Sequence, residues 1–266
     1  MQLKAEKMKL IDAHIHLSDK EYSKCADELV AEAKKSNVVA LVSNSVDLET
    51  SIGSLELAKR HLDTVYPALG IHPWNANMLR ENELEKTLKL ISDQHRKNLV
   101  AAIGEIGLDC KYETLWKKQL MVFEKMLHLA EKLDLPAIIH SRGTTAKIVE
   151  MLSSYNLKRV LLHWFSHPIS ALYKAVENGY FITEGPPAAY SNSIRQVVKK
   201  VPLTNLLTET DGPVKYYKAP YNGKLTKPSF ISTVVESVAD VKGMAVVDVA
   251  NQIAENFEAF FNIKFG

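Results

Sequence analysis

The stretch KLIDAHIHLSDKEYSK (Lys9–Lys24) decides the fold. Its first half is an apolar run that ends in two histidines, which is typical of a β-strand leading into a site. In an open, doubly wound sheet the loop after the first strand is normally rich in glycine, because the backbone there approaches a phosphate group closely. The loop after His16 contains no glycine. The stretch therefore favours a closed barrel of parallel strands over the doubly wound sheet.

Short apolar runs alternate with longer amphipathic segments along the rest of the chain. The runs predict eight strands: Leu10–His16, Val38–Ser43, Thr64–Ile71, Leu99–Ile106, Ala137–His140, Arg159–Phe165, Tyr180–Thr183 and Asn205–Glu209. The amphipathic segments predict helices such as Tyr22–Lys35, Leu48–His61, Leu84–His95, Thr114–Leu133 and Thr145–Ser154, with Ser229–Val241 and Val246–Phe261 in the tail. This alternation predicts an α/β fold, a (β/α)8 TIM barrel with parallel strands and extra C-terminal helices, as one domain spanning residues 1–266.

The composition is that of an ordinary globular protein. Of its 266 residues 46% are hydrophobic and 24% are charged, and the net charge is +2. Such a charge is too small to attract nucleic acid over a broad surface, so any attraction to a polyanion must be local. The chain has no apolar stretch long enough to span a bilayer, and its N-terminus lacks the apolar region of a signal peptide. The two cysteines, Cys25 and Cys110, form no CxxC motif, so we expect a reducing, cytoplasmic setting and no membrane or obligate protein partner.

Ionisable side chains gather at the predicted carboxyl ends of the strands, where TIM barrels carry their functional groups. They are His14, His16, His72, Glu105, Asp109, His140, Arg142, His163, Glu209 and Asp211. Each alone has an ordinary explanation, since a histidine after an apolar run is more often a hydrogen-bonded structural residue than a ligand. Burying ionisable groups is costly unless they are paired or bind a metal. The convergence of at least four histidines and two acids therefore favours a metal centre.

The types of ligand narrow the choice of metal. Imidazole and carboxylate groups suit Zn²⁺, Mn²⁺, Fe or Ni, and tolerate Mg²⁺ less well. Six ligands are too many for one tetrahedral ion and suit two ions about 3.5–4 Å apart. Two such ions need a bridging group, which in some two-metal barrels is a modified lysine. No lysine lies at the end of the fourth or fifth strand, so we expect Glu105 to bridge the two ions. The histidines in predicted helices, His61, His95 and His128, are interpreted as structural, and His167 remains open.

The motifs LIDAHIHLSD, GIHP, GEIGLD, IIHSR, LLHWFS and ETDGP, in this order, resemble the TatD family of metal-dependent deoxyribonucleases. The segment NFEAFF is similar to the closing helix of that family. The resemblance runs from about Lys9 to the C-terminus, and it implies a metal-dependent hydrolase of the TIM-barrel group.

The resemblance also implies a role for each site residue. The metal ligands would be His14, His16, Glu105, His140, His163 and Asp211. The first two and Asp211 would hold the more buried ion, the other two histidines would hold the second, and Glu105 would bridge. The catalytic residues would be Glu105 and Asp211, which orients or deprotonates the attacking water. His72 and Arg142 would bind the substrate phosphate, although a loop-packing histidine and a surface ion pair remain the alternatives.

The sequence departs from the family pattern at positions that are not proposed ligands. Ser18 is followed by Asp19 where the family usually has Asp or Asn directly, and Cys110 stands where an aromatic residue is common. The sixth-strand motif contains Trp164 and His167, which would narrow the pocket, stack on a base or pack against a neighbouring loop. The loop VKYYKAP, which contains Lys215, Tyr216, Tyr217 and Lys218, suits single-stranded nucleic acid or is simply a solvated loop.

The expected activity is hydrolysis of phosphodiester bonds by two divalent metal ions (Zn, Mn or Mg). The expected substrate is DNA, as single strands or strand ends, attacked as by an exonuclease. One alternative is a related TIM-barrel hydrolase that acts on an amide, a lactone or a small phosphoester, because the fold alone does not decide the reaction. Another is a non-catalytic barrel kept for binding, which the complete ligand set argues against.

Overall fold

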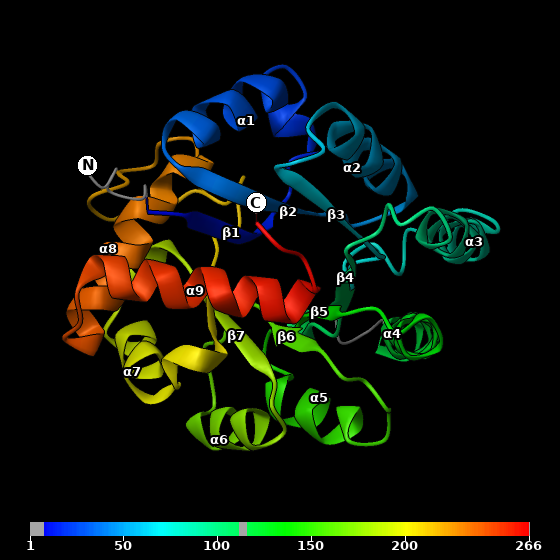
Figure 1. The fold of residues 1–266 in the computed structure, drawn as a ribbon. Coiled ribbons are helices and arrows are strands. Elements are labelled where there is room, and N and C mark those ends of the chain that lie inside the picture. Colours follow the sequence, from blue (N-terminus) through cyan, green and yellow to red (C-terminus); the bar gives the residue numbers. More distant parts are fainter. Residues whose placement is uncertain (1–7, 112–115, 266) are drawn as a thin grey trace.

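Eight parallel strands form one sheet, and each strand pairs with the next along the chain (Figure 1). The computed structural model describes residues 8–111 and 116–265. The strands are β1 (Leu10–Ile15), β2 (Val38–Asn44), β3 (Val65–Leu69), β4 (Ala102–Gly107), β5 (Ala137–His140), β6 (Val160–Leu162), β7 (Phe181–Glu184) and β8 (Leu206–Thr208). This order confirms the predicted TIM barrel.

The last strand returns to the first, so the barrel is nearly closed. The Thr208 hydroxyl donates to the Ile11 carbonyl at 2.6 Å. Beyond the strand ends, the Asp211 N–H donates to the His14 carbonyl at 2.9 Å, and the His16 N–H donates to the Gly212 carbonyl at 2.8 Å. The seam between β8 and β1 is therefore made in part by the backbone of residues that the sequence places in the metal site.

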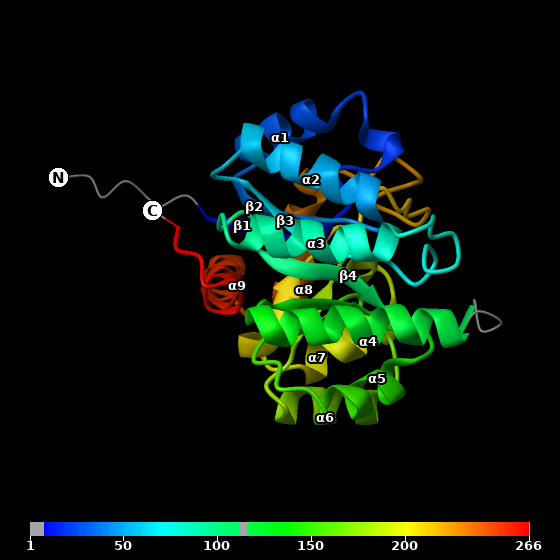
Figure 2. The same ribbon diagram turned by 90° about the vertical axis from the view of Figure 1, so that its right-hand side faces the viewer.

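Amphipathic helices surround the barrel (Figures 1 and 2). They are α1 (Ala26–Lys35), α2 (Leu48–Arg60), α3 (Glu83–His95), α4 (Trp116–Leu133), α5 (Thr145–Leu152), α6 (Ile169–Glu177), α7 (Asn192–Lys200), α8 (Ile231–Lys242) and α9 (Val246–Phe261). Helix α9 lies across the end of the barrel where the strands begin, which leaves the loops at the carboxyl ends of the strands on the opposite side. Within residues 8–111 and 116–265, none of the helices combines the length and the apolar character needed to cross a bilayer.

Several element boundaries differ from the predicted ones. The first helix begins at Ala26 rather than at Tyr22, because residues Lys20–Tyr22 form a separate 3-10 turn capped by the Asp19 side chain. The predicted strand Arg159–Phe165 is shorter, Val160–Leu162, because Trp164 has a positive φ of 40° that no strand can accommodate. Thr114 and Leu115, which the sequence places in the fourth helix, lie outside the described residues.

Candidate metal centre

The six predicted metal ligands meet at the carboxyl end of the barrel. They lie on or directly after five of the strands: His14, His16, Glu105, His140, His163 and Asp211. Four of these residues are at most 6% exposed, and the side chains of His16 and His140 are 14% and 12% exposed. Because so many ionisable groups are costly to bury together, a cation that pairs with them would offset this cost.

One group of donor atoms has the dimensions of a tetrahedral metal site. It consists of Nε2 of His14, Nε2 of His16, Oε2 of Glu105 and Oδ1 of Asp211. Five of the six distances between these atoms are 3.3–3.5 Å. The centre of a regular tetrahedron with such edges lies about 2.1 Å from each corner, which is the usual distance from Zn²⁺ to nitrogen. The donors therefore fit a divalent ion.

The other carboxylate oxygen of Glu105 faces a second group of donors. Its Oε1 lies 2.8 Å from Nε2 of His163 and 2.9 Å from Nδ1 of His140. These two nitrogens are 3.3 Å apart. Since each oxygen of Glu105 faces a different group, the side chain has the geometry that a ligand shared by two ions requires.

Outer hydrogen bonds fix which nitrogen of His16 and of His140 faces the centre. Nδ1 of His16 donates to the Asn44 carbonyl at 3.0 Å, and Nε2 of His140 donates to Oδ2 of Asp109 at 2.9 Å. Burial raises the pKa of Asp109, but hydrogen bonds from His140 and neighbouring groups outweigh burial and lower the pKa to about 2, so the acceptor is ionised. A neutral imidazole has one N–H, so its other nitrogen is left free to bind a cation.

His163 is supported in a comparable way by Glu209. Nδ1 of His163 lies 3.5 Å from Oε2 of Glu209, which also accepts a 2.5 Å hydrogen bond from the Thr183 hydroxyl. Burial lowers the pKa of His163, but the charges of Glu105 and Glu209 outweigh it and hold the pKa well above its ordinary value. The ring of His14 stacks on the ring of His163 at 3.9 Å, and burial lowers the pKa of His14. The pKa values of the two stacked rings are therefore shifted in opposite directions.

His72 also reaches the centre, and its hydrogen bonds favour a donor role over a ligand role. Its Nε2 lies 3.4 Å from Oε1 of Glu105, close enough to be counted among possible metal donors. Its Nδ1, however, accepts the Trp74 backbone N–H at 3.1 Å, so the proton of the neutral ring must sit on Nε2. Burial lowers the pKa of His72 to about 4, which keeps the ring neutral at physiological pH. A protonated nitrogen does not bind a cation.

Arg142 is placed differently from the other predicted site residues. It follows β5 and is exposed, and its carbonyl accepts a hydrogen bond from the Cys110 N–H at 3.0 Å. Within the described residues its guanidinium makes no hydrogen bond or ion pair. Its predicted contact with substrate phosphate stays a prediction.

Trp164, His167 and the loop after β8, which depart from the family pattern, differ in their exposure. Trp164 packs on the loop after β8, with its ring 5.9 Å from that of Tyr216, and His167 is exposed. Tyr216 is buried and its hydroxyl donates to the Thr210 carbonyl at 2.8 Å. Tyr217, its neighbour, is 78% exposed. Of the two tyrosines in the loop, only Tyr217 is therefore accessible to a substrate.

One buried acid at the centre was given no role by the sequence analysis. Oδ1 of Asp12 accepts the Thr210 N–H at 2.9 Å, and Oδ2 accepts the Thr210 hydroxyl at 2.6 Å. Asp12 thus ties β1, which carries His14, to the segment after β8, which carries Asp211. The spacing of Asp12, His14 and His16 could have predicted this position, because residues i, i+2 and i+4 of a strand share one face.

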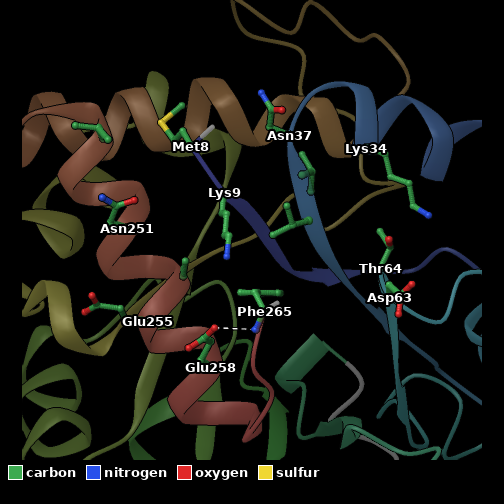
Figure 3. Close-up of a pocket in the computed structure, with 14 residues that line it drawn as sticks. Met8, Lys9, Lys34, Asn37, Asp63, Thr64, Asn251, Glu255, Glu258 and Phe265 are labelled. Carbon is green, nitrogen blue, oxygen red and sulfur yellow. Dashed lines mark hydrogen bonds between the residues drawn. The ribbon is translucent and has the colours of Figure 1, made fainter. Parts of the chain in front are cut away.

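A hollow of about 1000 Å³ lies at the opposite end of the barrel (Figure 3). It is lined by the beginnings of β2 and β3, by α9 and by residues near both ends of the described chain. Oε1 of Glu258 accepts the Phe265 N–H at 2.8 Å there, and Nζ of Lys9 lies 5.4 Å from the centre of the Phe265 ring. TIM barrels carry their chemistry at the carboxyl ends of the strands, so this hollow is not the metal centre.

The chain is similar to known proteins over nearly its whole length. The profile of the family described as TatD related DNase matches residues 11–262. An uncharacterized metal-dependent hydrolase of Methanocaldococcus jannaschii is 32% identical over 96% of this chain and 97% of its own length. Human deoxyribonuclease TATDN3 is 31% identical over 96% of this chain and 95% of its own. The crystal structure of YjjV, a TatD homologue from Escherichia coli, superimposes with a TM-score of 0.89 at 27% identity, covering 97% and 99% of the two chains.

Proposed function

The chain belongs to the family of TatD-related DNases and is a metal-dependent hydrolase, and from this premise we propose that it cleaves phosphodiester bonds of single-stranded DNA from a strand end with two divalent ions. The observation that carries the proposal is the placement of Glu105. Its two oxygens face two separate groups of imidazole nitrogens. This is the arrangement that a pair of ions acting on one phosphate group needs.

The chemistry of the donor set fits Zn²⁺ or Mn²⁺ best, and Mg²⁺ less well. His14, His16, Asp211 and Glu105 would hold one ion, and Glu105, His140 and His163 the other. When bound, the two ions would supply positive charge to the phosphoryl oxygens and lower the pKa of water.

The side chains of the centre perform the remaining steps. Burial raises the pKa of Asp211, but the hydrogen bond with His16 and the neighbouring histidines outweigh burial and hold the pKa below its ordinary value. Asp211 is therefore a carboxylate at neutral pH and accepts a proton from the attacking water. His72 donates its Nε2–H to a phosphate oxygen, and the exposed Arg142 binds the phosphate at the rim with its two parallel N–H groups.

The loop after β8 supports a single-stranded substrate. The ring of the exposed Tyr217 lies against Gly223, since a Cβ added to this glycine would lie 3.2 Å from the ring. Gly223 has a φ of 74°, a conformation that favours glycine, and its N–H donates to the Tyr216 carbonyl at 2.8 Å. Lys218 is exposed beside the ring of Tyr190, 5.5 Å from its centre. An exposed ring supported from one side suits an unpaired base, which would stack on its free face, and the nearby lysine would attract the backbone phosphates.

Replacing Tyr217 by alanine is expected to weaken the use of single-stranded DNA. Stacking on an aromatic side chain contributes about 1–3 kcal/mol per base, so KM should rise roughly 10-fold or more while kcat changes little. Steady-state rates on a fluorescent oligonucleotide measure both constants. Tyr173→Ala is the matched control, because Tyr173 is 49% exposed on α6, outside the loop after β8. An unchanged KM for Tyr217→Ala would remove this residue from the substrate site.

The pKa values of the histidines predict how the affinity for a cation depends on pH. Burial lowers the pKa of His16, but Asp211 and Glu105 outweigh it and raise the pKa to about 10. The pKa values of His140 and His163 are raised too. Raised pKa values favour the protonated rings in the metal-free protein, so cation binding is expected to release protons, and the apparent affinity should rise with pH. Calorimetric titration with Zn²⁺ in buffers of different ionisation enthalpy counts the protons; heats that do not depend on the buffer contradict the prediction.

The proposed function is tested with oligonucleotides labelled at the 5′ or the 3′ end. The protein is freed of metal with a chelator and then supplied with Mg²⁺, Mn²⁺ or Zn²⁺. We expect single-stranded DNA to shorten stepwise from one end, and only when a divalent ion is present. Metal-loaded protein that leaves this DNA intact but hydrolyses a lactone or a cyclic amide would refute the proposal and favour the alternative hydrolase.

A further inference from the structure

Trp74 lies beside the metal centre and contacts it through two separate N–H groups. It follows β3 in the loop that also carries His72. Its backbone N–H donates to Nδ1 of His72 at 3.1 Å, and its indole Nε1–H donates to Oδ2 of Asp109 at 2.7 Å. The centre of its ring lies 4.8 Å from that of His72 and 6.2 Å from that of His140. Trp74 therefore contacts both His72, the proposed hydrogen-bond donor to the phosphate, and Asp109, the partner of His140.

The carboxylate of Asp109 is held from all sides. Its Oδ2 accepts two hydrogen bonds, from the Trp74 indole at 2.7 Å and from Nε2 of His140 at 2.9 Å, while Oδ1 accepts the Lys111 N–H at 2.8 Å. The Asp109 backbone is bound at both its N–H and its carbonyl by the side-chain amide of Gln119. Asp109 is fully buried. The carboxylate is thus fixed in position, and Trp74 supplies one of its two contacts at the oxygen that faces His140.

An indole is well suited to this place. Its N–H can only donate, so it stabilises the ionised carboxylate and never competes with it for a proton. Nε2 of His140 lies 2.9 Å from Oδ2 of Asp109, so a hydrogen bond there holds the ring with its other nitrogen, Nδ1, 2.9 Å from Oε1 of Glu105. Outer partners of this kind typically change metal affinity by about 10–100-fold when they are removed.

We infer that Trp74 is a positioning residue that acts through Asp109 to hold His140 in the orientation that binds the second ion, and that the same residue holds His72 ready to donate to substrate. The inference rests on the two-ion site proposed above. It concerns the second ion, because the hydrogen bonds of Trp74 and Asp109 lead to His72 and His140. Trp74 therefore links how tightly the second ion binds to how His72 is oriented toward the substrate phosphate.

The substitution Trp74→Phe tests the inference, because it keeps the ring and the backbone N–H and removes only the indole donor. The metal-free protein is titrated with Zn²⁺ against a chromophoric chelator, without nucleic acid. His163→Ala identifies which binding step belongs to the second ion. We expect Trp74→Phe to weaken that step about 10-fold and to leave the other step unchanged. Trp116→Phe, on α4 with Lys147 4.4 Å from the centre of its ring, is the matched control and should alter neither step.

A double-mutant cycle separates positioning from a general loss of structure. Asp109→Asn should weaken the same step by up to about 100-fold. If Trp74 acts through Asp109, adding Trp74→Phe to Asp109→Asn produces no further loss. Full additivity, or wild-type binding of both ions by Trp74→Phe, overturns the inference and leaves the proposed nuclease activity standing. A wild-type protein that binds two ions as described but cuts no DNA overturns the activity and leaves the inference standing.

Discussion

The variant Glu105→Ala is expected to lose cleavage of single-stranded DNA by about 10⁴-fold or more. The side chain is 2% exposed, and its two oxygens are 2.8–3.4 Å from nitrogens of both donor groups. Alanine would remove the proposed shared ligand of the two ions and leave the surrounding histidines without their shared counter-charge. The measurement is the rate of shortening of an end-labelled oligonucleotide with saturating Mn²⁺ or Zn²⁺.

Glu105→Gln is the conservative partner of this variant. It keeps the size of the side chain but replaces one oxygen by an amide nitrogen, which cannot bind a cation. We expect it to bind one ion instead of two and to be nearly as inactive as the alanine variant. Far-UV circular dichroism of both variants should match the wild type, since β4 keeps its pairing with β3 and β5. Cleavage by Glu105→Ala at the wild-type rate would show that Glu105 does not bridge.

The second large effect is expected for Asp211→Asn, with kcat lowered by about 10²–10⁴-fold. Asparagine has the same shape and tolerates the positive φ of 49° found at Asp211. The backbone hydrogen bond from residue 211 to the His14 carbonyl is also kept. The substitution therefore removes only the negative charge and the ability to accept the proton of the attacking water. Steady-state kinetics on the labelled oligonucleotide measure the loss.

The concentration of the divalent ion separates the two roles of Asp211. If Asp211 is both ligand and base, excess Mn²⁺ fills the weakened site but does not restore kcat. Complete recovery of kcat at high Mn²⁺ would mean that Asp211 serves only as a ligand. The kcat of Asp211→Asn should also depend less steeply on pH, because the carboxylate that accepts the proton is gone.

The barrel was predictable because its strands are nearly continuous apolar runs that end in polar residues. The boundaries were less accurate where local conformation decides them, as at Trp164, whose positive φ ends β6 early. The helices Ile169–Glu177 and Asn192–Lys200 were not among the predicted segments.

The convergence of the proposed ligands could be predicted from their positions at strand ends. The groups that hydrogen-bond to these ligands could not. The acceptor for His16 is the carbonyl of Asn44, a backbone group that no side-chain pattern reveals. Asp109 was recognised as a strand-end acid, yet its pairing with His140 and Trp74 depends on how two loops meet in space. Tyr216 and Tyr217 are adjacent and chemically alike, and only the turn that ends at Gly223 determines that the second is exposed.

The seam between β8 and β1 has a consequence for the time at which the protein becomes active during its synthesis. The ligands span residues 14 to 211, and the backbone of Asp211 itself pairs with the strand that carries His14. Translation must therefore pass residue 211 before the chain contains every proposed ligand of the first ion. A nascent or truncated chain that stops short of residue 211 lacks the proposed base as well as the closing contact, so we expect it to lack the proposed activity.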